Sequence, residues 1–575
     1  MKRALSKLAK SPNNYFGIIG IVCIAIFLSI YGVRVLDVTY TDWLVSGGDT
    51  TQHYLGWRAY RESAWTFPIG MVDCLAYPNQ TSVIFTDSIP LFAVFFKLLS
   101  PILPADFQYF GIWGLLCFIL QGVMAARILR HFTDNKVAIV FGSVLLVYTP
   151  FMIRRMFSHT ALAGQWILLW ALEPLFAPAR YDDNKKIYAF AACIGAVSVA
   201  VHMYFFGMVT IIMLGICLQN VLRNKKITRA ISILAAYLGA GVFITWILGG
   251  FSSGMSAGDM TLLGVTSANL NAFFNSHQWS VIYQELPCGY AQWEGNGYLG
   301  AGGIFLLFFC ALLLLGQVNL FKETKRHWKI WMPMLLVFLV AFVFALSPKI
   351  MFGEQTLIEL PLPEFILNIW AIFRATGRFV WISSYLLLLV SCIVLFKQCG
   401  KRLAIVTICF VAALQFYDIH RQLDSRHEQF SPKVTSTSLS DGEAFWDTVG
   451  KDDEIQHVVY YRWDRDENLW PSVTDWALDN DKTVNTFYFA RSMDELIEED
   501  RKAAFETLSE NNLYIFSVND KAACAEYDLN YYEVSGIIVG LVNPVPGYTP
   551  LPASYFEEEA PANDESTQAE VSQAS

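Results

Sequence analysis

The sequence predicts a polytopic α-helical membrane protein that carries a small α/β domain outside the membrane. Hydrophobic residues make up 54% of the 575-residue chain and charged residues only 16%, a balance that soluble globular proteins do not have. Apolar stretches long enough to cross a bilayer recur through residues 1–417. The rest of the chain alternates short apolar runs with charged helical ones, as in a water-exposed α/β domain.

About eleven apolar stretches are candidates for membrane-spanning helices, because roughly 20 helical residues cross a hydrocarbon core of about 30 Å. The stretch 90–103 is shorter, contains Lys97 and lies between Pro90 and Pro104. We therefore expect it to be interfacial or re-entrant. The predicted spans are 16–35, 107–129, 136–152, 160–178, 187–202, 204–222, 228–249, 298–319, 330–347, 379–397 and 401–417.

Basic residues indicate the orientation of these spans. Segments on one side are rich in Lys and Arg, whereas the long loop 250–297 on the other side contains neither. The positive-inside rule then places the N-terminus in the cytoplasm and the end of the last span outside. We expect a multi-pass protein of the plasma (inner) membrane with large outer loops at 36–106, 250–297 and 348–378.

Net charge changes sign where the predicted membrane domain, 1–417, ends. That domain has 30 basic and 18 acidic residues, a net charge of +12, whereas residues 418–575 have 11 basic and 32 acidic residues, a net charge of −21. The basic inner surface suits anionic membrane lipids, and the acidic outer part argues against a nucleic acid partner. We predict a linker at 418–440, an extracytoplasmic α/β domain at 441–555 and a disordered acidic tail at 556–575.

Strand and helix patterns support the outer domain. Val, Ile, Tyr and Phe dominate four short runs, which predict strands. A longer run at 492–509 has the apolar spacing of an amphipathic helix. The predicted strands are 457–461, 483–489, 513–518 and 534–542.

The loop after the first span places acids at the outer boundary between water and lipid. Asp49 begins a stretch in which aromatic residues, including Tyr54 and Trp57, recur at helical spacing, which suits a helix lying in the headgroup plane. Asp49 and Gln52 also fit a capping box. Asp49 is therefore a helix cap, a general base, or both, and His53 lies one turn further along the same face.

Arginines in other outer segments are candidates for binding a phosphate. Arg374 and Arg378 are four residues apart, so on a helix they would share one face and could grip a phosphate together. Arg155 and His159 form a second such group after the third span. The alternative for both groups is contact with ordinary lipid headgroups.

Three further acids are candidates for the site. Asp87 precedes the short stretch 90–103 and is either a second acid or the cap of a helix there. Glu294 follows Trp293, a pairing found both in sugar-binding sites and in membrane-interface belts. Asp42 is close enough in sequence to share a metal ion with Asp49. His202, by contrast, is interpreted as a satisfied buried histidine.

Three motifs in the first outer loop resemble those of a family of uncharacterised bacterial membrane proteins in the GT-C glycosyltransferase superfamily. They are GDTTQHYLGW at 48–57, FPIG at 67–70 and FTDSIPL at 85–91. The layout resembles the superfamily over 15–420. This resemblance implies that Asp49 is the catalytic acid, although the chain lacks the adjacent Asp-Asp or Asp-Glu pair of some branches.

The resemblance leads us to expect a membrane glycosyltransferase. Its donor would be a polyprenyl-phosphate sugar, and its acceptor a cell-envelope glycan, glycolipid or protein on the outer face. The cofactor is not fixed by the sequence, and a divalent cation, Mg or Mn, is one candidate. The expected roles are catalysis for Asp49, His53 and Asp87, donor-phosphate binding for Arg374, Arg378, Arg155 and His159, substrate binding for Trp57 and Glu294, and metal binding for Asp42 and Asp49.

Two other functions stay open on the sequence. A lipid or glycan transporter or flippase would carry ionisable residues at mid-membrane depth, and the predicted spans have almost none. A polysaccharide polymerase or ligase would depend on the outer arginines and not on Asp49. The chain has no P-loop, dinucleotide fingerprint or GxSxG motif, which argues against nucleotide hydrolysis and serine hydrolase chemistry.

Overall fold

A computed structural model of the chain describes residues 15–45, 47–252, 260–316, 327–430, 439–463, 469–491 and 493–557. The chain divides into two compact units. The first unit consists of Met1–Arg61, Trp65–Met71 and Ser82–Lys433, and the second of Glu62–Ala64, Val72–Thr81 and Val434–Ser575. The predicted tail at 556–575 lies almost entirely outside the described residues.

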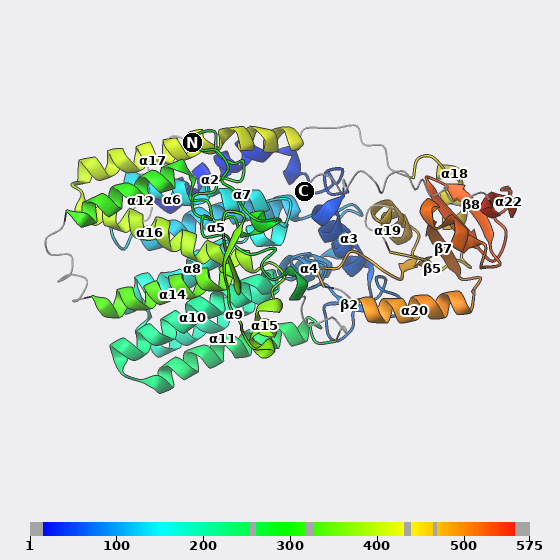
Figure 1. The fold of residues 1–575 in the computed structure, drawn as a ribbon, viewed down its shortest axis with the longest axis horizontal. Coiled ribbons are helices and arrows are strands. Elements are labelled where there is room, and N and C mark those ends of the chain that lie inside the picture. The colour runs from blue at the N-terminus through cyan, green and yellow to red at the C-terminus, as the bar shows by residue number, and fades with distance from the viewer. Residues whose placement is uncertain are drawn as a thin grey trace, which may run out of the picture. The chain divides into compact units, whose positions relative to one another are not determined.

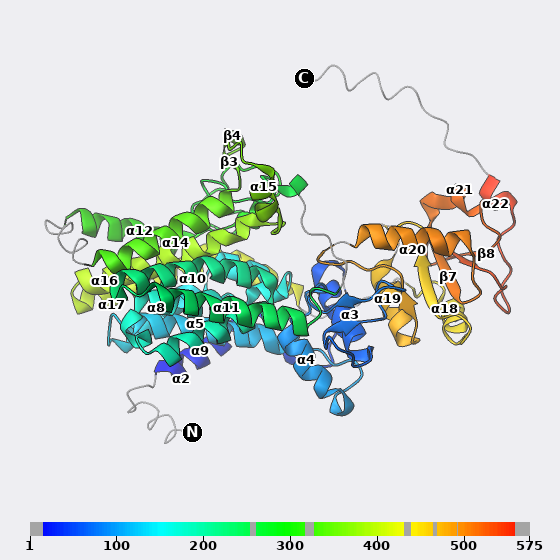
Figure 2. The same cartoon turned by 90° about the horizontal axis from the view of Figure 1, so that it is seen from below.

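Long apolar helices build the first unit and run alongside one another (Figures 1 and 2). Within the described residues, seven are long and apolar enough to cross a membrane, and three shorter ones are also apolar. The seven are α5 (Phe110–Leu129), α9 (Asn184–Val201), α10 (Met203–Asn224), α11 (Ile227–Ile247), α14 (Trp328–Leu346), α16 (Val380–Gln398) and α17 (Lys401–Gln429). The three are α2 (Tyr15–Tyr31), α6 (Lys136–Val147) and α12 (Gly300–Leu315).

These helices confirm a multi-pass, mostly helical membrane protein, but not the predicted count of eleven spans. The remaining predicted span, 160–178, contains α8 (Trp166–Phe176), which has only 11 residues and includes Pro174. The stretch predicted to be interfacial or re-entrant forms α4 (Pro90–Leu98), whose 9 residues are too few to cross the hydrocarbon core.

Helix α17 extends well beyond the predicted end of the membrane domain at 417. It continues to Gln429, so the first half of the predicted linker 418–440 is helical. The buried carboxylate of Asp418 stabilises this extension: it accepts hydrogen bonds from the Tyr298 hydroxyl (2.8 Å), the Ala301 amide (2.9 Å) and the Ser280 hydroxyl. The apolar run ends at the charged residue Asp418, but the helix does not end there: Asp418 lies within α17 and is buried.

Short elements between the long helices carry the candidate site. Helices α3 and α4 lie beyond one end of the long helices in both views (Figures 1 and 2). A two-stranded antiparallel hairpin, β3–β4, precedes α15. The short elements are η1 (Arg34–Leu36), α3 (Gly48–Glu62), β1 (Met71–Val72), β2 (Thr81–Ser82), η2 (Ser100–Ile102), α7 (Pro150–Arg155), η3 (Thr160–Ala163), η4 (Pro178–Tyr181), η5 (Met260–Leu262), η6 (Gln292–Gly295), β3 (Lys349–Phe352), β4 (Gln355–Glu359), α15 (Glu364–Ala371) and η7 (Thr376–Phe379).

The second unit contains a five-stranded mixed sheet in the order β6-β5-β7-β9-β8. Strands β6, β5 and β7 are parallel, and β9 and β8 join antiparallel. Its core includes Tyr514, Phe516, Phe505 and Tyr531. The elements are α18 (Glu443–Gly450), β5 (His457–Tyr460), α19 (Trp470–Asp479), β6 (Thr483–Val484), α20 (Asp494–Glu506), β7 (Asn512–Ser517), η8 (Val518–Asp520), α21 (Lys521–Cys524), β8 (Asn530–Val534), β9 (Ile537–Leu541) and α22 (Ser554–Glu557).

Candidate functional site

Asp49 lies in the first turn of α3 and is not the cap of that helix. The chain enters α3 through Gly47 and Gly48, whose φ angles of 99° and 72° favour glycine. The Gly47 amide bonds the Thr51 hydroxyl (2.8 Å), whereas the Asp49 carboxylate makes no backbone hydrogen bond within the described residues. Its Oδ2 instead lies 3.5 Å from His159 Nε2, and its side chain is 25% exposed.

The neighbouring Arg155 fixes the tautomer of His159. A guanidinium can only donate hydrogen bonds, and Arg155 Nη1 lies 3.3 Å from His159 Nδ1. Nδ1 is therefore the acceptor, and the hydrogen of the neutral ring is on Nε2, which faces Asp49. Arg155 thus orients the imidazole toward the carboxylate.

Glu294 holds two arginines together in a buried ion pair. Arg155 donates from Nη1 to Oε1 (3.2 Å) and from Nη2 to Oε2 (2.8 Å), and Arg378 donates from Nε to Oε2 (2.8 Å). This connects the Asp49–His159 pair to two guanidinium groups. We call Asp49, His159, Arg155, Glu294 and Arg378 the acid–arginine cluster.

The acid–arginine cluster requires close approach between η6 and η7. A Cβ added to Gly377 would lie 2.6 Å from the Cα of Gly295, so only glycine lets these two segments pack closely enough to join Arg378 to Glu294. The guanidinium of Arg378 also lies over the ring of Tyr204, 4.8 Å from its centroid. Its two terminal nitrogens make no hydrogen bond with the described residues and remain available to an anion.

The electrostatics of the acid–arginine cluster fix its protonation states. Burial alone would raise the pKa of Glu294, but attraction to Arg155 and Arg378 outweighs it and holds the pKa well below the ordinary value. Burial, reinforced by repulsion from the same arginines, holds the pKa of His159 well below 6.5. At neutral pH Glu294 is therefore ionised and His159 is neutral.

A second acid–histidine pair forms between Asp87 and His202. The Tyr204 amide donates to His202 Nδ1 (3.1 Å), which leaves the ring hydrogen on Nε2, 3.2 Å from Asp87 Oδ1. Burial opposes ionisation of Asp87, but the interaction with His202 and the nearby His53 outweighs it and lowers the pKa to about 2. Asp87 does not cap α4, because Ile89 occupies the cap position.

His53 lies between the two acids. It is buried, and burial lowers its pKa although the charges of Asp87 and Asp49 act to raise it. Its Nδ1 has no hydrogen-bond partner within the described residues. This ring nitrogen therefore lacks the partner that buried polar groups usually have.

Contacts between α3 and the segment 86–88 bring the Asp49–His159 and Asp87–His202 pairs into one site. A Cβ on Gly56 would lie 2.4 Å from Thr86 Cβ, so the absence of a side chain there permits the approach. The Ser88 hydroxyl then donates to the carbonyl of His53 (2.7 Å). This packing places Asp87 opposite the face of α3 that carries Asp49 and His53.

Two predictions about site residues change in the structure. Trp57 is fully buried and donates its indole N–H to the Phe107 carbonyl (2.9 Å), so it has no surface for substrate. Arg374 and Arg378 do not share a helix face: η7 begins at Thr376, and Arg374 is exposed on the preceding segment while Arg378 is buried. The chain leaves α15 in an irregular turn, which four-residue spacing cannot reveal.

The aromatic stripe of α3 also differs from its predicted role in the headgroup plane. Tyr54, Trp57 and Tyr60 are buried in the protein, whereas Trp65, beyond the helix end, is half exposed. Helical spacing identifies an apolar face but not what that face packs against. Here it packs against protein and fixes the position of Asp49.

Glu294 and the two arginines of the acid–arginine cluster offer no ligand to the predicted Mg or Mn ion. Asp49 faces an N–H hydrogen of His159, and both oxygens of Glu294 are bonded to arginines, whose charges would repel a dication. Asp42 is exposed on the turn before α3, and metal binding by Asp42 and Asp49 stays a prediction. Within the described residues, the three metal-ligating side chains that do meet are His277, Glu285 and Cys288.

The sequence interpretation missed two residues of the site. His202 was expected to be a satisfied buried histidine, and Tyr204 was not singled out. Both flank the start of α10, where His202 is the cap and its side chain accepts the Tyr204 amide. A histidine directly before the first residue of an apolar helix is the signal that could have indicated a helix cap.

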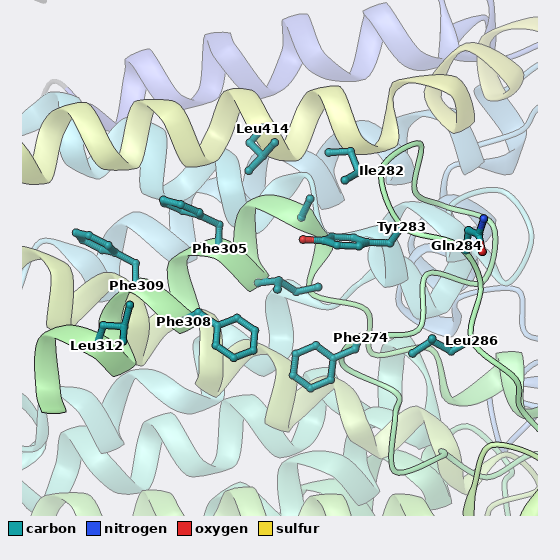
Figure 3. Close-up of a pocket in the computed structure, with 12 residues that line it drawn as sticks. Phe274, Ile282, Tyr283, Gln284, Leu286, Phe305, Phe308, Phe309, Leu312 and Leu414 are labelled. Carbon is teal, nitrogen blue, oxygen red and sulfur yellow. The ribbon is translucent and has the colours of Figure 1, made fainter.

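An apolar groove of about 780 Å³ is lined by α12, the loop before it and Leu414 of α17. Figure 3 shows the phenylalanines of α12 beside side chains of the loop that precedes it, with Leu414 of α17 at the top of the view, above Phe305 and Ile282. Phe308 and Leu312 are more than half exposed. The lining residues are Phe274, Ile282, Tyr283, Gln284, Leu286, Ala301, Ile304, Phe305, Phe308, Phe309, Leu312 and Leu414.

The neutral state of His159 predicts a pH effect on stability. Its pKa in the folded protein is well below 6.5, so below pH 6.5 the unfolded chain takes up a proton that the folded protein does not. Stability is therefore lost as the pH falls, by up to about 1.4 kcal/mol per pH unit. Thermal unfolding in detergent between pH 7.5 and 5.5 should show a steeper loss for wild type than for His159→Gln, and equal slopes would contradict the assignment.

Comparisons with known proteins identify a family and a set of similar structures. The family model described as "Domain of unknown function (DUF6311)" matches residues 20–420, and the "DUF6311 C-terminal domain" model matches residues 445–542. The comparison with curated proteins finds no match.

The similar solved structures include several of the oligosaccharyltransferase of Archaeoglobus fulgidus. The one tethered to an acceptor peptide is 12% identical with a TM-score of 0.47, covering 93% of this chain and 75% of that one. The one with an inhibitory peptide and a dolichol-phosphate is 10% identical with a TM-score of 0.45, covering 94% and 77%. Because these TM-scores are below 0.5, the function is argued below from the site itself.

Proposed function

Because this chain belongs to the family described as a domain of unknown function, DUF6311, we propose its activity from the site: it is a membrane glycosyltransferase. It moves a sugar from a polyprenyl-phosphate donor to a glycan, glycolipid or protein acceptor of the cell envelope. We place the reaction at the outer face of the plasma membrane, where the positive-inside rule puts the loops that carry the site.

One observation carries this proposal: the acid–arginine cluster joins a partly exposed carboxylate to an arginine with unused donors. Asp49 is 3.5 Å from His159, and Arg378 is held 2.8 Å from Glu294 by its Nε alone. A base for a hydroxyl group and a cation for a phosphate are the two groups that transfer from a phosphate-linked sugar requires.

The reaction follows from these positions. The acceptor hydroxyl attacks the anomeric carbon of the donor sugar, and Asp49 takes the hydroxyl proton as the new C–O bond forms. The bond between that carbon and the phosphate oxygen breaks, and its electron pair leaves with the phosphate. The terminal nitrogens of Arg378 stabilise the charge that develops on the phosphate.

Two neighbouring groups position these residues. His159 presents its Nε2–H to the Asp49 carboxylate at 3.5 Å, and Glu294 holds Arg378. Asp87 lines the same site, and the buried His53 supports both acids through its electrostatic interactions with them.

The apolar groove on α12 offers a place for the hydrocarbon chain of the donor. Aromatic and aliphatic side chains line it almost throughout (Figure 3). Burying hydrocarbon against such a surface is favourable by about 0.8 kcal/mol per methylene in water, but a chain moving from the bilayer gains only the packing difference. The groove therefore aligns the lipid more than it adds affinity.

Replacing Arg378 by lysine should lower the transfer rate by about 10²–10³-fold, the range seen when one transition-state donor is removed. A lysine ammonium cannot hold Glu294 and also present a planar pair of donors to the phosphate. The matched control is Arg374→Lys, which changes an exposed arginine and should leave the rate near wild type. Equal losses in both variants would remove Arg378 from its assigned role.

Membranes that contain the protein test the proposed function against lipid transport. They are supplied with a panel of polyprenyl-phosphate sugars labelled in the sugar, together with envelope extracts as acceptors. A glycosyltransferase converts the label to a product that the lipid extraction no longer removes. A flippase moves the labelled lipid across the bilayer with its sugar–phosphate bond intact, and that result would replace the proposal.

A further inference from the structure

Three metal-ligating side chains meet in the outer loop 274–288, outside the acid–arginine cluster. They are His277, Glu285 and Cys288, and their ligand atoms all lie within 4.8 Å of one another. His277 and Cys288 are at the two ends of the loop, and Glu285 is near its second end. None of the eleven cysteines, all of which the structure describes, forms a disulfide, so the Cys288 sulfur is available as a ligand.

His277 supplies the observation that points to a ligand. Its side chain is 4% exposed, yet its Nδ1 has no hydrogen-bond partner within the described residues. Glu285 Oε1 is the nearest acidic atom, at 3.6 Å, which is too long for a hydrogen bond. Two ligand atoms bound to one tetrahedral metal at about 2.1 Å are roughly 3.4 Å apart, so this spacing suits a shared metal better than a direct bond.

The rest of the loop holds the three residues together. Asn275 bonds Leu286 twice, donating to its carbonyl (2.9 Å) and accepting from its amide (3.0 Å), and Asn271 donates to the Pro287 carbonyl (2.9 Å). These bonds join the two ends of the loop without using any of the three ligands. The ligands are therefore brought together by the fold and not by one another.

We propose that His277, Glu285 and Cys288 bind a divalent metal of the zinc class. Nitrogen, carboxylate and thiolate ligands in one site favour Zn²⁺ over Mg²⁺ or Ca²⁺, which prefer oxygen ligands only. Binding releases the Cys288 thiol proton to water, and the carboxylate and thiolate then neutralise the two charges of the ion. A water completes the fourth position on the exposed side of Glu285.

The metal would fasten the wall of the apolar groove. Ile282, Tyr283 and Leu286 of the same loop line that groove, and the proposed ligands flank them. Joining both ends of a loop removes conformational freedom from the segment between them. This role does not depend on the proposed glycosyl transfer, so either can fail alone.

Cobalt binding tests the site on the full-length protein in detergent. After treatment with a chelator, the protein is titrated with Co²⁺ alone, and we expect one ion per chain with the near-ultraviolet absorption of a cobalt–thiolate bond. Added Zn²⁺ should remove that absorption. Cys288→Ser should abolish it, and His277→Ala and Glu285→Gln should weaken Co²⁺ binding by about tenfold or more. Cys399→Ser, which changes a half-buried cysteine outside the triad, should keep it.

A second measurement uses only the wild-type protein. Zn²⁺ should slow alkylation of Cys288, followed by mass spectrometry of its peptide, while the alkylation of Cys399 stays unchanged. Protection of Cys288 together with a cobalt–thiolate absorption supports the site. The absence of saturable Co²⁺ binding to wild type, or an absorption that survives in Cys288→Ser, would overturn it.

Discussion

Asp49→Asn should reduce sugar transfer by about 10²–10⁴-fold, the usual contribution of a general base, while the protein stays folded. The asparagine oxygen can still face the Nε2–H of His159, so the change removes the base and leaves the neighbouring contact. The rate of transfer from a polyprenyl-phosphate donor is the measurement. Equal expression and the same elution from size-exclusion chromatography in detergent would show that the fold is intact.

Asp42→Asn is the matched control for this experiment. Asp42 lies on the same loop after α2 but is exposed before α3, so its replacement should leave transfer close to wild type. If the two variants lose activity equally, the two acids act together, as the metal-sharing prediction requires. If Asp49→Asn keeps the wild-type rate, Asp49 is not the base, and a mechanism based on the outer arginines is favoured.

Glu294→Gln should destabilise the protein by about 3–5 kcal/mol, the range for breaking a buried ion pair by removal of one partner. Glutamine leaves Arg155 and Arg378 buried beside each other without the carboxylate to which both donate. The same change should also lower transfer, since Arg378 loses the anchor that aims it at the phosphate. Thermal unfolding in one fixed detergent measures the first effect, and the transfer assay the second.

Two comparisons separate this effect from a general loss of a glutamate. Glu359→Gln changes an exposed residue of β4 and should alter stability by no more than about 0.5 kcal/mol. The double variant Glu294→Gln with Arg378→Gln should lose less stability than the two single variants added together, because the residues are in contact. A stable Glu294→Gln protein, or strictly additive losses, would show that the ion pair does not hold the site.

Apolar length and periodicity predicted most helices, but not how the loops pack. Spans such as 228–249 and 330–347 correspond closely to α11 and α14, because a run of apolar residues that long has few other stable states in a membrane protein. The aromatic face of α3 could equally have met lipid or protein. The packing of the surrounding chain determines which of the two this face meets, and the local spacing of the aromatic residues does not reveal it.

The hairpin of β8 and β9 shows that a continuous run of β-forming residues can contain a turn. The predicted strand 534–542 runs through Ser535 and Gly536, whose φ angles of 56° and 81° are both positive, as a type I′ turn requires. The structure places β8 before this turn and β9 after it. The serine–glycine pair between two runs of β-forming residues indicates this turn, and the strand prediction did not use it.

The candidate site could be predicted as a set of residues but not as an arrangement. Asp49, His159, Glu294 and Arg378 come from four segments far apart in the chain, and no spacing rule pairs them. The sequence interpretation assigned Glu294 to substrate and Arg155 to phosphate, whereas the structure binds them to each other. Glycines at 295 and 377 allow Arg378 to reach the same glutamate, and their role is visible only when both segments are in place.

The most direct test of the central claim is whether the purified protein cleaves a sugar–phosphate bond in a way that depends on Asp49. Wild type and Asp49→Asn are each incubated with polyprenyl-phosphate sugars and envelope acceptors, and free polyprenyl phosphate and glycosylated acceptor are quantified by mass spectrometry. The account predicts that wild type forms both products in equal amounts with at least one donor and that the variant forms neither above background. Equal product formation by the two proteins, or no cleavage of any donor by wild type, would contradict it.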